Sequence, residues 1–119
     1  LKQFGLEEPE EDGDFLAQYI GIVKKHISDP DLDISVIYEA LGMSRANFYR
    51  KVKAITGLSP NELIRNIRLE AGAKLLKESD MNISEIAEHV GFSSSSYFAR
   101  SFKATYGISP TEYQKKQTK

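Results

Sequence analysis

Side chains rich in hydrogen-bond donors and acceptors cluster in the segment that follows Gly42. Arg45, Asn47 and Arg50 fall within six residues of one another, on a stretch whose apolar pattern predicts a helix. A guanidinium can form two parallel hydrogen bonds with guanine, a carboxamide can do the same with adenine, and an alanine methyl can touch the methyl of thymine. The candidate base-reading side chains of this segment are Arg45, Ala46, Asn47, Tyr49 and Arg50.

A second segment, after Gly91, offers a similar but less discriminating set of groups. Its run of serines can hydrogen-bond with more than one base, so Arg100 is its best candidate for base reading. We therefore expect this segment to contribute mainly affinity and register. The exposed face of its predicted helix carries Ser95, Ser96, Ala99 and Arg100.

Other polar residues of the two segments suit contacts with phosphate groups rather than with bases. Lysine ammonium groups bind phosphate oxygens as point charges, and serine, asparagine and helix N-termini also contact them. The candidates for phosphate contacts are Lys51, Lys53, Lys103, Ser59 and Asn61.

Each segment lies in a predicted pair of helices separated by a glycine. A short helix is expected over Ile34–Leu41 with Asp33 as its N-cap, and another from Ile83 with Asn82 and Glu85 forming a capping box. A short helix, a glycine turn and a longer helix are typical of the helix-turn-helix motif, whose second helix enters the major groove of DNA. Phe48, Val52, Phe98 and Phe102 are the residues of the two longer helices expected to point inward.

The two pairs are copies of one pattern. Gly42-Met43-Ser44 returns as Gly91-Phe92-Ser93, and Gly57-Leu58-Ser59-Pro60 returns as Gly107-Ile108-Ser109-Pro110. The offset is 49 residues at the first glycines and 50 at the prolines, so one residue separates the two registers. The repeat indicates one physical operation performed twice.

The whole sequence from Asp14 onward predicts helices, and no alternating strand pattern competes. We expect an all-α fold of about seven helices, in which a long central helix, Pro60 to about Glu78, joins two helix-turn-helix subdomains. That helix is apolar on two opposite sides, which favours packing on both. The expected boundaries are an acidic linker over 1–13, a first subdomain over 14–58, the connecting helix over 59–79 and a second subdomain over 80–119, with 14–116 acting as one DNA-binding unit.

The net charge of −1 conceals an uneven distribution. Residues 1–14 contain six acidic groups and one lysine, whereas residues 44–77 contain eight basic groups and two glutamates. A basic block inside a folded region fits contact with a polyanion, although a solvated helix face without a partner has the same composition. A protein-interaction module whose basic face docks an acidic partner is the alternative from another class; the salt and sequence dependence of DNA binding separates the two.

Residue types needed for several kinds of catalysis are missing. The 119 residues contain no cysteine, no paired carboxylates, no nucleophile beside a histidine and no phosphate-binding loop. His26 and His89 have no second ligand at metal-binding spacing. We therefore expect no enzyme activity, no metal and no cofactor.

The sequence resembles the DNA-binding domain of AraC-type transcription regulators over roughly residues 15–114. The resemblance rests on Gly91-Phe92, the run from Ser96 to Lys103, Gly107-Ile108-Ser109-Pro110 and Tyr113, with Leu41-Gly42-Met43-Ser44 and Ile67-Arg68-Leu69 upstream. It implies seven helices and sequence-specific binding of bacterial promoter DNA through two recognition helices in adjacent major-groove segments. Carried over residue by residue, it adds Tyr97 to the groove contacts; Gln114 stands where the family usually has a basic residue.

The resemblance also implies partners. They are double-stranded promoter DNA and RNA polymerase, and an upstream receiver or sensor domain in a longer chain of the two-component type. Dimerisation would involve regions outside this segment. The resemblance places the domain in the cytoplasm and leaves open a membrane anchor elsewhere in the full-length protein.

Overall fold

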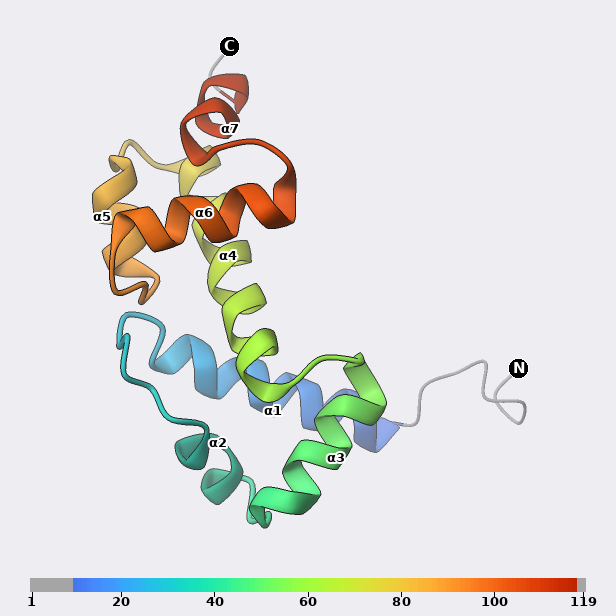
Figure 1. The fold of residues 1–119 in the computed structure, drawn as a ribbon. Helices are drawn as coiled ribbons and strands as arrows, with labels where there is room; N and C mark the ends of the chain where they lie inside the picture. Colours follow the sequence, from blue (N-terminus) through green and yellow to red (C-terminus); the bar gives the residue numbers. More distant parts are fainter. Residues whose placement is uncertain (1–9, 118–119) are drawn as a thin grey trace, which may run out of the picture. The chain divides into compact units, whose positions relative to one another are not determined.

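The computed structural model describes residues 10–117, which form seven α-helices and contain no β-strand (Figure 1). This confirms the predicted all-α class and the long helix that begins at Pro60. The helices are α1 (Glu10–Lys25), α2 (Ile34–Ala40), α3 (Arg45–Thr56), α4 (Pro60–Glu78), α5 (Ile83–His89), α6 (Ser95–Tyr106) and α7 (Pro110–Gln117).

The capping groups predicted from the sequence form hydrogen bonds at the starts of the helices. The Asn82 side chain accepts from the backbone N–H of Glu85 at 2.8 Å, and the Glu85 carboxylate accepts from the N–H of Asn82 at 2.9 Å. Ser59 and Glu62 make the same reciprocal pair at the start of α4. These side chains supply partners for backbone N–H groups that have none within the helix.

Two helices extend beyond the limits expected from the sequence, which are Asp14 for the start of the first helix and Tyr113 for the end of the last. α1 begins at Glu10, so residues 10–13 of the expected linker are helical; residues 1–9 lie outside the described part. Acidic residues at a helix start interact favourably with the positive end of the helix dipole, which accounts for the earlier beginning. α7 continues past Tyr113 to Gln117, with Lys115 and Lys116 in its last turn, where positive charge is favourable.

The helices belong to two compact units that are interleaved along the chain. Residues 10–25 and 33–63 belong to the first unit, and residues 26–32 and 64–117 to the second. α2 and α3 therefore lie in the first unit, and α5 and α6 in the second. Most of α4, from Ile64 onward, belongs with the second unit.

The first unit is built around stacked aromatic rings. Tyr19 of α1 is fully buried and stacks on Phe48 of α3 with the ring centroids 5.5 Å apart, while Phe15 meets Phe48 edge-on at 6.3 Å. The Tyr19 hydroxyl donates to the carbonyl oxygen of Pro60 at 2.7 Å, which gives the buried polar atom a partner. Burial, and to a lesser degree the nearby Tyr49, raise the pKa of Tyr19 well above its usual value.

Removing the Tyr19 hydroxyl should cost about 1 kcal/mol of unfolding free energy, the usual value of one hydrogen bond, because the stacked ring remains in place. The measurement is urea denaturation of Tyr19→Phe. Tyr38→Phe is the matched control, since Tyr38 also packs against Phe48, at 5.7 Å, and its hydroxyl has no hydrogen-bond partner among residues 10–117. An equal loss in both variants would contradict the role of the Pro60 contact.

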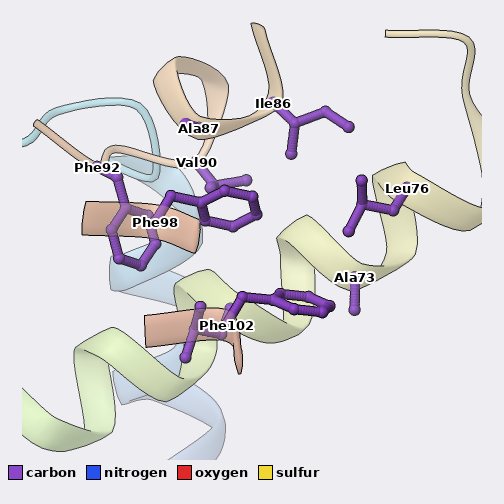
Figure 2. Packing of buried hydrophobic residues seen from close by; sticks show 9 residues of the cluster. Ala73, Leu76, Ile86, Ala87, Val90, Phe92, Phe98 and Phe102 are labelled. Atoms are coloured by element: carbon purple, nitrogen blue, oxygen red, sulfur yellow. The ribbon is translucent and has the colours of Figure 1, made fainter. Parts of the chain in front are cut away.

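The core of the second unit joins α4, α5 and α6. Figure 2 shows Phe98 and Phe102 of α6 beside Ala73 and Leu76 of α4 and the side chains of α5. Phe98 and Phe102 are fully buried, as predicted. Gln114 of α7 donates to the carbonyl oxygen of Met81 at 3.3 Å, so the residue that departs from the family pattern bonds within this unit.

Arg68 of α4 is a buried charged residue in the second unit, 6% exposed. Its Nη1 donates to the carbonyl oxygens of Ile27 at 2.7 Å and Val90 at 2.9 Å, and its Nη2 donates to that of Asp29 at 2.8 Å. Burial lowers the pKa of Arg68, and the nearby Asp29 carboxylate partly offsets this decrease. These contacts give Arg68 a structural role.

The backbone at Gly91 packs closely against Arg68. Gly91 adopts a left-handed conformation with φ of +83°, and a Cβ atom added there would lie 1.4 Å from Arg68 Nη1 and 2.3 Å from the Ile27 carbonyl oxygen. Gly42, at the same point of the first helix-turn-helix, has φ of +68° but nothing within 4 Å of such an atom. Equivalent glycines therefore stand in different surroundings.

Candidate nucleic-acid interface

The two faces of α3 differ sharply in exposure. Ser44 caps the helix by accepting from the backbone N–H of Asn47 at 3.2 Å, and Phe48 and Val52 are fully buried behind it. This packing turns the opposite face outward from the first turn onward. The exposed residues of that face include Arg45, Ala46, Asn47, Arg50 and Lys53, all of them candidates from the sequence.

Four of the base-reading candidates on α3 contact one another in pairs. Arg45 Nη2 donates to the Tyr49 hydroxyl at 3.4 Å, and its guanidinium carbon lies 5.1 Å from the centre of the Tyr49 ring. Arg50 Nη2 donates to the side-chain oxygen of Asn47. Both pairs join residues three or four positions apart, which are neighbours on a helix surface.

The two lysines of α3 occupy different surroundings. Lys53 donates to the carbonyl oxygen of Gly57 at 3.1 Å, at the C-terminal end of α3, where a cation is electrostatically favourable. Lys51 lies over the ring of Phe15, with its ammonium 5.0 Å from the ring centre. The structure therefore brings Lys53 beside the exposed face and sets Lys51 towards α1.

A surface groove brings α3 and the start of α4 together within the first unit. Ser59 and Pro60 line it together with Arg50 and Lys53. Ala54 also lines this groove and lies one turn beyond Arg50 on the exposed face, although it was not among the sequence candidates. Its position four residues after Arg50 could have revealed it, because helical periodicity places both on one side.

In the second unit, α6 exposes a comparable face. Ser94 caps α6 by accepting from the backbone N–H of Tyr97 at 3.0 Å, and Phe98 and Phe102 face the core. The exposed residues include Ser95, Ser96, Tyr97, Arg100 and Lys103, whereas Ala99 is half-buried. The side chain of Tyr97 is 39% exposed, and its ring packs edge-on against Phe92 with the centroids 5.3 Å apart.

The two helices correspond at an offset of 50 residues. Arg100 and Lys103 occupy the positions of Arg50 and Lys53, but Tyr97 stands at the position of Asn47. The turn before α6 is one residue longer than the turn before α3, which is the register difference noted in the sequence. The same scaffold thus presents an arginine in both copies with different neighbours.

The described residues contain neither a candidate metal cluster nor a candidate membrane span. In residues 10–117, no group of three or more histidine, aspartate or glutamate side chains could hold a metal ion. No helix in this range has the length and apolar character needed to cross a bilayer.

A helix-turn-helix pair with an exposed, donor-rich second helix, present twice, defines a nucleic-acid-binding class of domain. Comparison with known proteins agrees: the family model described as "Helix-turn-helix domain" matches residues 37–116. The HTH-type transcriptional regulator MtrA of Neisseria gonorrhoeae is 38% identical over 96 residues, which cover 79% of this chain and 32% of MtrA.

Solved structures give the same result. The C-terminal domain of AraT, a response regulator from Geobacillus stearothermophilus, is 33% identical, with 86% of this chain and 84% of that one covered and a TM-score of 0.75. The DNA-binding domain of AdpA, a global transcriptional factor solved with a target DNA, is 27% identical over 85% of this chain and 90% of that one, with a TM-score of 0.76. This chain belongs to the AraC-type helix-turn-helix family, a family of DNA-binding domains of transcription regulators rather than of enzymes.

The chain corresponds to only part of its curated relatives. It spans 8% of the length of the first of them and 28–42% of the next three.

Proposed function

We propose that this domain recognises a specific promoter sequence by inserting α3 and α6 into adjacent major-groove segments. The observation that carries the proposal is the paired arrangement of two serine-capped helices. Each buries a phenylalanine and a second apolar residue on one side and exposes an arginine on the other, Arg50 in α3 and Arg100 in α6. AdpA, which shares the fold, was solved with a target DNA bound.

The roles of individual side chains follow from their chemistry and exposure. We assign base contacts to the exposed faces of the two helices and phosphate contacts to the lysines and to the N-terminus of α4. The residues on the surfaces that we propose face the bases are Arg45, Ala46, Asn47, Tyr49, Arg50, Ser95, Ser96, Tyr97 and Arg100; the phosphate group is Lys51, Lys53, Lys103, Ser59 and Asn61.

The proposal extends to the longer protein. An upstream receiver or sensor domain would control this output domain, in keeping with its likeness to the C-terminal domain of the response regulator AraT. We place the domain in the cytoplasm, in contact with RNA polymerase, and we assign any dimerisation to regions outside this chain.

Selection of bound duplexes from a random pool by this chain tests the function. A defined consensus with two recognised segments is expected, together with affinity that falls steeply as salt rises, because lysines and arginines displace counterions from phosphates. Binding of all duplexes with equal affinity would overturn the proposal, and selection of only one segment would overturn the two-helix part.

Arg50→Ala and Lys53→Ala should affect binding in different ways. Loss of the Arg50 guanidinium should weaken binding to the selected duplex by about 1–3 kcal/mol and relax the preference at one base pair. Loss of the Lys53 ammonium should weaken binding to selected and random duplexes alike and reduce the salt slope by about one. Fluorescence anisotropy titrations over a salt series measure both quantities; identical behaviour of the two variants would show that Arg50 does not read a base.

A further inference from the structure

The hydrogen bond between Asn47 and Arg50 suggests that the two side chains have different roles in α3. We infer that Asn47 acts as a positioning residue, which holds the Arg50 guanidinium for guanine, rather than reading adenine itself. This inference rests on the proposed function, since it concerns the same DNA-binding face.

Asn47 is well placed to hold another side chain. Its backbone N–H donates to Ser44, so its main chain is fixed at the N-cap of α3. Its side-chain oxygen accepts from Nη2 of Arg50, one turn further along the same exposed face. A mobile arginine loses rotamer entropy when it docks, so an arginine already oriented in the unbound protein loses less.

The hydrogen-bonding capacities of the Arg50 guanidinium and the Asn47 carboxamide support base reading by Arg50 and positioning by Asn47. A guanidinium has five N–H donors, and a bidentate contact with guanine uses two of them, so Arg50 can serve Asn47 and a base together. A bidentate contact between asparagine and adenine uses the side-chain oxygen and the NH₂ group in one plane. In the structure that oxygen faces Arg50.

The second recognition helix lacks this arrangement. Tyr97 stands at the position that corresponds to Asn47, and its ring packs against Phe92. Arg100 therefore has no carboxamide three residues before it. The difference predicts that α3 discriminates its guanine more strictly than α6 does.

A double-mutant cycle tests the inference with the 119-residue chain and the duplex selected by it. The readout is the ratio of affinities for the selected and a scrambled duplex, measured for the wild type, Asn47→Ala, Arg50→Ala and the double variant. Positioning predicts that Asn47→Ala lowers the ratio about three- to tenfold in the wild type but less than twofold in the Arg50→Ala background, because coupled residues are not additive. Circular dichroism confirms that each variant is folded.

Asn47→Asp provides the conservative control. Aspartate keeps an acceptor oxygen for Arg50 but has no N–H for adenine, so the ratio of affinities should stay within about twofold of the wild type. The added negative charge should weaken binding to both duplexes. Equal losses from Asn47→Ala in both backgrounds, or a ratio in Asn47→Asp as low as in Asn47→Ala, would overturn the positioning role alone. A wild-type ratio near one would overturn the proposed function, and this inference with it.

The same cycle on α6 gives an internal comparison. Tyr97→Ala and Arg100→Ala should be additive, because the Tyr97 ring packs on Phe92 instead of bonding to the arginine. Strong coupling between Tyr97 and Arg100 would mean that coupling does not depend on the carboxamide, which contradicts the inference.

Discussion

Replacing Gly91 with alanine is expected to destabilise the protein by about 3 kcal/mol or more, a loss typical of strained backbone combined with disrupted buried contacts. The added Cβ would lie 1.4 Å from Arg68 Nη1 and 2.3 Å from the Ile27 carbonyl oxygen. The Arg68 side chain could move away only by breaking its hydrogen bonds to buried carbonyl oxygens. The Ile27 carbonyl oxygen could move away only if the backbone shifted. Urea denaturation followed by circular dichroism measures the change in unfolding free energy.

Three other glycines serve as matched controls, because they share the left-handed backbone without the close neighbours. Gly42, Gly57 and Gly107 have φ values of +68°, +77° and +84°, and nothing lies within 4 Å of an added Cβ at any of them. Alanine at each should cost only the strain of a left-handed residue, about 1–2 kcal/mol. If Gly91→Ala costs no more than these three, the close packing of Arg68 against the turn is not a determinant of stability.

Arg68→Ala is expected to lower the unfolding free energy by about 3–5 kcal/mol, since it leaves buried partners uncompensated. Three main-chain carbonyl oxygens, those of Ile27, Asp29 and Val90, would lose their charged donor at once. Arg68→Lys should recover only part of this loss, because an ammonium cannot reproduce the planar fork of the guanidinium. Denaturant titration of the three proteins provides the measurement.

Arg65→Ala controls for the removal of a positive charge from α4. Arg65 lies one turn before Arg68 and is half-exposed, so its loss should change stability by less than about 1 kcal/mol. The double variant Gly91→Ala with Arg68→Ala should lose much less than the sum of the single losses, because both substitutions break the same contacts. Additive losses, or equal losses at Arg65 and Arg68, would contradict this account.

Local sequence signals predicted most of the fold because they act over three or four residues. The pairs Ser59–Glu62 and Asn82–Glu85 mark helix starts, and their hydrogen bonds form as expected. The exposed faces of α3 and α6 followed from the four-residue spacing of the buried apolar pairs Phe48–Val52 and Phe98–Phe102. The helix expected from Asp14 begins at Glu10, because its acidic first residues favour a helix start, whereas Pro9, Gly5 and Gly13 are typical of a linker.

Long-range contacts explain what could not be predicted. Gly42 and Gly91 look equivalent in the sequence, and only the structure shows that Arg68, 23 positions earlier than Gly91, fills the space beside one of them. Within the candidate site, periodicity showed that Asn47 and Arg50 share a face but not that they bond to each other. The position of Lys51 over Phe15 depends on the packing of α1, which no local pattern encodes.

The interleaving of the two units along the chain limits how such domains can be recombined. Arg68 takes two of its three acceptors from Ile27 and Asp29, which precede both helices of the first helix-turn-helix in the sequence. A chimera joined at a single point in α4 would therefore combine an arginine from one parent with a loop from the other. A hybrid made from this chain should therefore keep its own residues 26–32 together with its segment from Ile64 onward, which takes two exchanges.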